Sequence, residues 1–253
     1  MTARFTGKTV LVTGGGTGIG RGIALAFARE GANVVVSGRR AEPLKETVAL
    51  IEAAGGAGAA VTADVTDSRS VERLVEETVD RFGSLDVAVN NAGLFVPSAP
   101  VADIPEADFR QALDANVTGV FLSLKHEIAH MRAHGGGAVV NVSSNLGAHQ
   151  RAAGLGAYVA SKAALSALTR NAALDHIADG VRVNAVSPGK VDAPMSTLPG
   201  ESPREKTERM RREMLTGRAA RPEEIAAAVL YLASEDAAST VGADLVVDGG
   251  ATA

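Results

Sequence analysis

A tyrosine and a lysine four positions apart are the residues best suited to acid–base chemistry. Tyr158 and Lys162 stand in Tyr158-Val159-Ala160-Ser161-Lys162, within a segment of helical spacing, so both side chains fall on one helix face. A free phenol, with a pKa of about 10, is a poor base at neutral pH. A nearby ammonium group stabilises the phenolate and lowers that pKa, which suits proton exchange with a substrate oxygen. The alternative is an amphipathic helix with a surface lysine and a part-buried tyrosine.

A glycine-rich turn near the N-terminus has the composition of a phosphate-binding loop. The first apolar run leads into Thr13-Gly14-Gly15-Gly16-Thr17-Gly18-Ile19-Gly20 and then into a helical segment. Glycines allow a tight turn and a close approach of backbone to phosphate. The helix that follows would offer free N–H groups and the positive end of its dipole. The turn therefore predicts a dinucleotide site, with a loop that merely turns as the alternative.

The residues after the second apolar run indicate which dinucleotide to expect. Folds of this kind usually place an acidic residue there to bind the adenosine ribose, but this chain has Ser37-Gly38-Arg39-Arg40. Two arginines could pair with a ribose 2′-phosphate, although they could also be solvated loop charges. Thr17 weakens the case, since a basic residue in the glycine turn often helps to hold that phosphate. We expect NADP(H) in preference to NAD(H).

Short β-branched runs alternate with helical spacing from end to end. The runs lie at residues 9–13, 33–37, 59–62, 87–90, 138–143, 181–187 and 244–247. The helical segments lie at 19–30, 41–54, 68–82, 106–131, 155–178 and 223–233. This order predicts an α/β fold, a doubly wound (Rossmann) parallel sheet of seven strands with helices on both faces. We expect one NAD(P)-binding domain over residues 1–253, with an irregular segment at about 190–220 covering the substrate.

Composition excludes several other classes of protein. The 25 basic and 29 acidic residues give a net charge of −4 and form no basic stripe, so we expect neither nucleic acid nor membrane as a partner. The absence of cysteine excludes a disulfide scaffold and a thiolate nucleophile. No apolar run reaches the roughly 18 residues of a membrane helix, and the N-terminus reads as a first strand rather than a signal peptide. A cytoplasmic protein is the expectation.

Two groups of polar residues have more than one interpretation. His126, His130 and His134 recur every four residues and could bind a metal from one helix face. We favour a polar stripe near a helix end and expect no metal site. His149, Gln150 and Arg151 lie between Ser144 and Tyr158. They suit a hydroxylated or anionic substrate and equally suit an exposed loop end.

Motifs in a fixed order make the chain resemble the short-chain dehydrogenase/reductase family over nearly its whole length. They are Thr13-Gly14-x-x-x-Gly18-Ile19-Gly20, Asn90-Asn91-Ala92-Gly93, Asn141-Val142-Ser143-Ser144, Tyr158-x-x-x-Lys162, Ser187-Pro188-Gly189 and Val246-Val247-Asp248-Gly249-Gly250. The resemblance implies an oxidoreductase that interconverts a carbonyl and a secondary alcohol by hydride transfer with a nicotinamide cofactor. It also implies a small-molecule substrate and a homo-oligomer, either a dimer or a tetramer.

The resemblance implies a role for individual residues. Tyr158 would exchange the proton, Ser144 would hydrogen-bond the substrate oxygen, Lys162 would lower the Tyr158 pKa and hold the nicotinamide ribose, and Asn116 would anchor a proton-relaying water. The implied cofactor-binding residues are Gly14, Thr17, Gly18, Ile19, Gly20, Arg39, Arg40, Asp64, Val65, Asn91, Ala92, Gly93, Tyr158, Lys162, Pro188, Gly189 and Val191. The substrate pocket would be formed by Phe95, Val96, the 145–156 loop and the 190–220 cover.

The chain also departs from the family's pattern. Ala193 stands where many members have a threonine that contacts the nicotinamide carboxamide. The chain looks similar to 3-oxoacyl-[acyl-carrier-protein] reductases in length and C-terminal pattern, yet Gly135 and Asp179 stand where those members tend to carry basic residues for the carrier. A 3-oxoacyl-thioester reductase therefore remains an alternative. A non-catalytic dinucleotide-binding sensor or scaffold is the alternative of another class.

Overall fold

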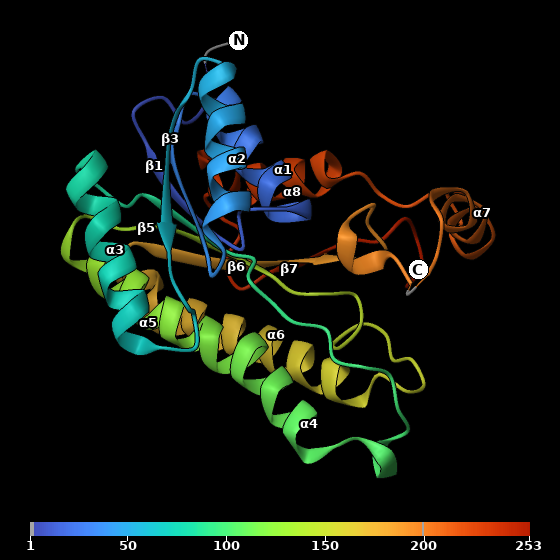
Figure 1. The fold of residues 1–253 in the computed structure, drawn as a ribbon. Coiled ribbons are helices and arrows are strands. Elements are labelled where there is room, and N and C mark those ends of the chain that lie inside the picture. The colour runs from blue at the N-terminus through green and yellow to red at the C-terminus, as the bar shows by residue number, and fades with distance from the viewer. Residues whose placement is uncertain (1–2, 199) are drawn as a thin grey trace.

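The computed structural model describes residues 3–198 and 200–253, and a seven-stranded sheet forms its centre (Figure 1). The strand order is β3-β2-β1-β4-β5-β6-β7, and every pair of neighbours is parallel. The strands are β1 (Thr9–Thr13), β2 (Asn33–Gly38), β3 (Ala57–Thr62), β4 (Val87–Asn90), β5 (Gly137–Val142), β6 (Val181–Pro188) and β7 (Asp244–Val247). The predicted doubly wound parallel sheet is confirmed.

Alternate residues of the strands feed two separate cores. Val10, Val12 and Val34 pack on one face of the sheet, beneath α1 (Gly18–Arg29), α2 (Ala41–Ala53) and α8 (Pro222–Ala233). Leu11 and Val35 pack on the opposite face, against α3 (Ser68–Phe82), α5 (Gly119–Ala133) and α6 (Gly156–His176). Figure 1 shows these helices in two layers, one on each side of the sheet. This arrangement explains why the strands are apolar at successive positions rather than at every second one.

Two expectations about the helices are wrong in detail. The segment 106–131 is not one helix, because α4 (Glu106–Leu113) and α5 are separated by a π-helical turn, η2 (Asp114–Thr118). The segment 190–220 is not wholly irregular. It contains a short 3-10 turn, η4 (Pro194–Ser196), and the helix α7 (Pro203–Glu213), which begins with a capping box in which Ser202 and Glu205 exchange hydrogen bonds. Such a box satisfies N–H groups that the first turn leaves free.

The remaining elements are short. They are the 3-10 turns η1 (Val101–Asp103), η3 (Ile177–Asp179) and η5 (Glu235–Ala237). No helix within residues 3–198 and 200–253 is long and apolar enough to span a membrane.

The strand order reverses between β1 and β4, and this reversal fixes where a ligand can bind. Helices that follow β1 and β4 leave the sheet on opposite faces, so a crevice opens at the carboxyl ends of the two strands. The glycine turn follows β1, Asn91 follows β4, and Ser144 lies just beyond β5. The topology therefore brings three of the sequence motifs to one edge of the sheet.

Candidate active site

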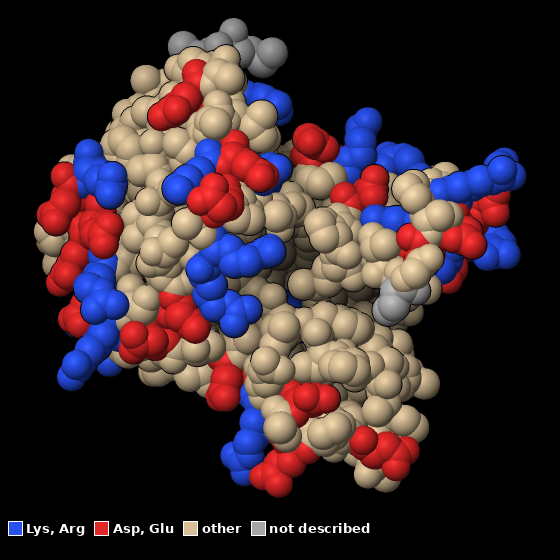
Figure 2. Space-filling view, viewed as in Figure 1, with Lys and Arg blue, Asp and Glu red and all other residues tan. Residues whose placement is uncertain are grey.

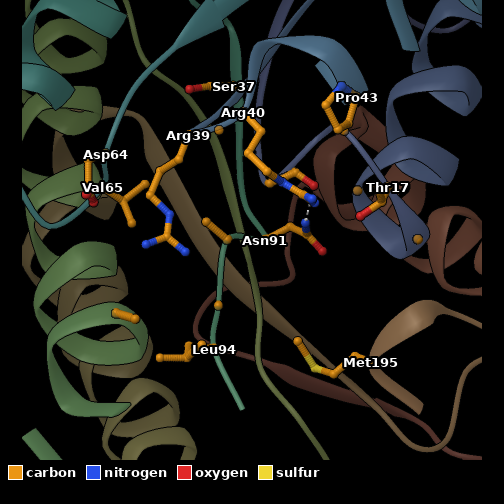
Figure 3. A pocket seen from close by; sticks show the side chains of 18 of the residues that line it. Thr17, Ser37, Arg39, Arg40, Pro43, Asp64, Val65, Asn91, Leu94 and Met195 are labelled. Atoms are coloured by element: carbon orange, nitrogen blue, oxygen red, sulfur yellow. Dashed lines mark hydrogen bonds between the residues drawn. The ribbon is translucent and has the colours of Figure 1, made fainter. Parts of the chain in front are cut away.

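A cavity of about 870 Å³ opens at the carboxyl ends of β1, β2 and β4. A cavity of this size can hold a cofactor. Figure 2 shows the hollow on this face of the molecule, with Lys and Arg side chains beside it, and Figure 3 shows residues of its wall. The lining comes from the glycine turn, the end of β2, the first turn of α2, the 63–66 and 91–94 segments, part of the π turn with nearby Gln111, and residues 193–195 of the cover segment.

The glycine turn is packed too tightly for side chains. A Cβ on Gly20 would lie 2.2 Å from the Gly14 carbonyl oxygen and 2.5 Å from Asn91 Nδ2. Asn91 Nδ2 donates to the carbonyl oxygens of Thr13 (3.0 Å) and Gly14 (3.1 Å), so β4 holds the turn in place. Helix α1 starts at Gly18, where φ is +53°. Its first N–H groups therefore lie at the wall of the cavity without intrahelical partners.

The end of β2 brings positive charge to the cavity. Arg39 and Arg40 are exposed and line it, and neither guanidinium has an ion pair or hydrogen bond to any residue that the structure describes. Figure 3 shows Arg39 extending on the side of Asp64 and Val65. Beside them the Ser37 hydroxyl is buried and has no partner among the described residues. Buried polar groups are nearly always hydrogen-bonded, so this part of the wall is suited to a ligand with negative charge and hydrogen-bonding oxygens.

Asp64 lines the cavity on the side toward which Arg39 extends (Figure 3). Its carboxylate accepts hydrogen bonds from the Thr66 backbone N–H (3.0 Å) and hydroxyl (2.8 Å). These bonds, helped by the charge of Arg39, hold the pKa of Asp64 below its ordinary value. The carboxylate is therefore ionised at neutral pH and remains able to accept a further hydrogen bond.

Ser144, Tyr158 and Lys162 lie together near Gly93 of the cavity wall, where a Cβ would lie 3.7 Å from Lys162 Nζ. Burial raises the pKa of the Tyr158 phenol, while a hydrogen bond with the Ser144 side chain acts in the opposite direction. The Ser144 oxygen also accepts from the Leu146 N–H at 3.1 Å, which leaves its proton available to donate.

The ammonium of Lys162 is buried in the same cluster. Its Nζ lies 5.9 Å from the centre of the Tyr158 ring and donates to the Val142 carbonyl at 2.9 Å. Burial lowers the pKa of Lys162 to about 8. A buried ammonium with one hydrogen bond has two further N–H groups for water, ribose hydroxyls or substrate.

Asn116 lies in the π turn and ties the segment after β4 to helix α6. Its Oδ1 accepts from the Leu94 N–H at 2.7 Å, and its Nδ2 donates to the Leu94 carbonyl at 2.9 Å and to Ser161 Oγ at 3.0 Å. A Cβ on Gly93 would lie 3.2 Å from Asn116 Oδ1 and 3.7 Å from Lys162 Nζ. Glycine at position 93 therefore keeps open the space between these two polar groups.

The structure brings most of the sequence-predicted residues to one place. The cavity lining contains Gly14, Thr17, Gly18, Ile19, Gly20, Arg39, Arg40, Asp64, Val65, Asn91, Ala92 and Gly93. It does not contain Asn116, Ser144, Tyr158, Lys162, Pro188, Gly189 or Val191. Of these, Pro188 accepts from the Asn145 N–H at 2.9 Å, Gly189 packs against Asp248, and Val191 is buried beside Ala220.

Some residues that line the cavity are not among those predicted from the sequence. Gly16, Ser37, Thr66, Leu94, Gln111, Asp114 and Ala115 belong to the lining, as do Pro194 and Met195 of the cover segment. Gly16 lies within the glycine turn and Ser37 lies two residues before Arg39. Their positions in these two motifs are the sequence signal that could have identified them as lining residues. Nothing in the sequence marks Gln111 or Ala115, because the π turn that carries the chain past the cavity has no sequence signature here.

The histidine stripe has local partners. His126 Nε2 lies 3.0 Å from Ser68 Oγ, and His134 Nδ1 lies 2.7 Å from the His130 carbonyl oxygen. The rings of His130 and His134 stack with centres 4.0 Å apart. Within the described ranges, no three His, Asp or Glu side chains are grouped so that they could hold a metal ion.

Comparison with known proteins finds similar dehydrogenases and reductases. A family model described as enoyl-(acyl carrier protein) reductase matches residues 14–252. The cis-4-hydroxycyclohexanecarboxylate dehydrogenase of Sinomonas cyclohexanicum is 43% identical over 253 residues, which cover 100% of both chains. The cyclohexanol dehydrogenase of an Acinetobacter strain is 35% identical and covers 100% of this chain and 98% of its own.

A solved structure agrees with these relatives. A short-chain type dehydrogenase/reductase from Mycobacterium marinum superposes with a TM-score of 0.91 at 33% identity, covering 99% of this chain and 98% of that one. Matches of this extent show that the chain belongs to the short-chain dehydrogenase/reductase family.

Proposed function

We propose that Ser144, Tyr158 and Lys162 carry out the proton chemistry of this NAD(P)-dependent oxidoreductase, which interconverts a carbonyl group and a secondary alcohol. The observation that carries the proposal is the meeting of a serine hydroxyl, a buried phenol and a buried ammonium beside the cavity. The named relatives act on CH–OH groups, which favours this reaction over 3-oxoacyl-thioester reduction and over a non-catalytic sensor.

Each side chain then has a distinct task. In the reducing direction, the Tyr158 hydroxyl gives its proton to the substrate oxygen, and the Ser144 hydroxyl donates a hydrogen bond that stabilises the charge developing there. The cationic form of Lys162 favours the phenolate that Tyr158 becomes. In the oxidising direction the phenolate takes the proton back. The nicotinamide cofactor, when bound, supplies or accepts the hydride.

Asn116 has a positioning task. Both N–H groups of its amide are committed to Leu94 and Ser161, so its side chain fixes the segment around Gly93 against α6. A water that relays protons to Lys162 would bind the Asn116 backbone carbonyl or the remaining lone pair of Oδ1. Replacing Asn116 with Asp would keep the shape of the side chain but remove its two amide N–H groups. The variant therefore tests whether the hydrogen bonds to Leu94 and Ser161 are needed.

We propose NADP(H) as the preferred cofactor, because the wall around Ser37 fits a phosphate. Arg39 and Arg40 supply two guanidinium groups without acidic partners in the described structure, and the Ser37 hydroxyl supplies an unused hydrogen-bonding group. Gly14, Thr17, Gly18, Ile19 and Gly20 would hold the pyrophosphate, Asp64 and Val65 the adenine, and Asn91, Ala92, Gly93, Pro188, Gly189 and Val191 would flank the remaining part of the cofactor.

Fluorescence titration with NADPH and with NADH tests this assignment. Each of Arg39→Ala and Arg40→Ala should weaken NADPH binding by about tenfold, the worth of one charged hydrogen bond at a partly screened site, while leaving NADH binding unchanged. Arg73→Ala, which removes an exposed arginine of α3, is the matched control. Equal losses for NADPH and NADH, or none, would show that the two arginines do not read a 2′-phosphate.

We further propose cyclic secondary alcohols as the substrates to test first, which the names of the two relatives support. The assay is nicotinamide oxidation with cyclic ketones, open-chain ketones and 3-oxoacyl thioesters. Ser144→Ala should lower kcat by about 100-fold or more if its hydroxyl stabilises the developing charge. Turnover on thioesters alone would favour the acyl-thioester alternative. Tight cofactor binding with no turnover on any compound would favour the sensor.

The cover segment, oligomeric state and location complete the proposal. Ala193 lies 3.2 Å from the position of a Cβ on Gly18, which supports the 190–220 segment as a cover over the site within one domain. Exposed apolar side chains on α5 and α6, Phe121 and Leu174, support a homo-oligomer, a dimer or a tetramer, which sedimentation velocity would measure. The lack of cysteine favours a cytoplasmic location.

A further inference from the structure

An exposed aromatic ring lies directly against the proposed acid–base residue. The Phe95 ring centre is 4.9 Å from that of Tyr158, at an interplanar angle of 51°. Phe95 keeps 40% of its surface exposed, whereas Tyr158 keeps 9%. A large apolar side chain left open to water beside a reactive group is characteristic of a ligand-binding surface.

The backbone that carries Phe95 is held on both sides. Asn116 bonds both the N–H and the carbonyl of Leu94, at 2.7 and 2.9 Å. Val96 is buried in a small apolar cluster with Ala112 and Ala157. The backbone at Phe95 is therefore fixed before a ligand arrives, and binding against this segment costs little backbone entropy.

Two polar residues of the 145–156 loop, His149 and Gln150, contact other side chains of the protein. His149 Nε2 lies 3.1 Å from the buried carboxylate of Asp244, although its N–H is not aligned for a hydrogen bond. The Gln150 side-chain oxygen accepts from Asn145 Nδ2 at 3.3 Å. Two of the three residues that could recognise a hydroxylated or anionic substrate thus contact other side chains, and the third, Arg151, is exposed. The apolar ring of Phe95 remains open next to Tyr158.

From this arrangement we infer that Phe95 determines substrate specificity: its open face contacts the hydrocarbon ring or chain that carries the reacting carbon. The inference rests on the proposed function, in which the substrate oxygen meets Tyr158 and Ser144. The preferred substrates are then ketones and secondary alcohols with an apolar ring or another bulky hydrocarbon group at the reacting carbon. Polyhydroxylated compounds are disfavoured, because contact with Phe95 would remove water from their hydroxyl groups without replacing its hydrogen bonds.

A pair of ketones of equal shape tests the inference. Cyclohexanone and tetrahydropyran-4-one differ only in one ring CH₂ that is replaced by oxygen. We expect a higher kcat/KM for cyclohexanone. Phe95→Ala should lower kcat/KM on cyclohexanone by about tenfold or more, mostly through KM, and should bring the ratio of the two values towards one. Phe95→Leu, which restores apolar volume, should recover most of the ratio.

Controls separate a specificity role from a structural one. Phe109→Ala removes another phenylalanine of similar exposure, 38%, on α4 and should leave the ratio unchanged. NADPH affinity and the pH profile of kcat should be the same in the Phe95 variants as in the wild type. If Phe95→Ala lowers kcat/KM equally on both ketones, or on neither, Phe95 does not select the substrate.

The outcomes also separate this inference from the proposed function. Turnover that requires Tyr158 but shows no preference between the two ketones overturns the role of Phe95 alone. Absence of ketone-dependent NAD(P)H oxidation, or oxidation that persists in Tyr158→Phe, overturns the proposed function and the inference with it.

Discussion

Replacing Glu127 with glutamine should stabilise the protein at alkaline pH and have much less effect in mild acid. Glu127 lies on α5 and is 1% exposed. Asn90 Nδ2 donates to its carboxyl at 2.9 Å and also to Asn141 Oδ1 at 3.1 Å. This network joins the end of β4 to β5, immediately before the segments that carry Asn91 and Ser144. Burial without a cationic partner in the described structure raises the pKa of Glu127 from 4.5 to about 7.

The sign and size of the change in stability follow from the difference between the pKa of Glu127 in the folded and the unfolded state. The folded state holds the Glu127 proton more tightly than the unfolded state, so stability from this group is present below pH 4.5 and is lost as pH rises through about 7. A difference of about 2.5 pKa units, at 1.36 kcal/mol each, corresponds to a loss of about 3 kcal/mol above pH 8. Glutamine keeps the shape of the protonated carboxyl and does not ionise, so the variant should escape this loss.

Urea unfolding followed by circular dichroism at pH 5 and pH 8.5 measures the effect. The unfolding free energy of Glu127→Gln minus that of the wild type should be about 2 to 3 kcal/mol larger at pH 8.5 than at pH 5. Glu76→Gln, which removes an exposed carboxylate of α3, should show no such pH dependence. Parallel curves for Glu127→Gln and the wild type, or a variant that is less stable at pH 8.5, would refute the reasoning.

Other substitutions test the cofactor turn, the ammonium group and the substrate loop. Gly20→Ala places a Cβ 2.2 Å from the Gly14 oxygen, so it should abolish detectable NADPH binding in a fluorescence titration and cost about 1–3 kcal/mol of stability; normal binding would show that the turn does not need this glycine. Lys162→Met removes the cation beside Tyr158, so the pH profile of alcohol oxidation should shift to higher pH; an unchanged profile would remove Lys162 from that role. Arg151→Ala should reduce the preference for carboxylate-bearing ketones over neutral ones if the exposed arginine reaches the substrate, and an unchanged preference would place it outside the pocket.

The fold was largely predictable because its strands are marked by period and composition. Buried parallel strands are continuously apolar, and the expected and observed strand bounds differ by at most two residues. The helix α7 has a capping signal in Ser202-Pro203 and Glu205, but its charged sequence has no apolar stripe of helical period. The π turn at residues 114–118 had none, since no proline interrupts the segment and its first glycine is Gly119.

The site was predictable where motifs carry it and unpredictable where packing creates it. The positions of Gly20, Asn91, Tyr158 and Lys162 follow from their spacing along the strands and helices. The Ser37 hydroxyl, which has no partner among residues 3–198 and 200–253, and the open face of Phe95 both depend on which groups other segments place beside them. Sequence pattern does not reveal such neighbours, because they come from elements far apart in the chain.

The most direct test of the account is the turnover of Tyr158→Phe with the cofactor affinity measured on the same preparation. Phenylalanine keeps the ring against Phe95 and removes only the hydroxyl that exchanges the proton. The account predicts that kcat for cyclohexanone reduction falls by about 100- to 10 000-fold while NADPH affinity is unchanged. Near-normal turnover by Tyr158→Phe would contradict the account, because the proton would then come from another group.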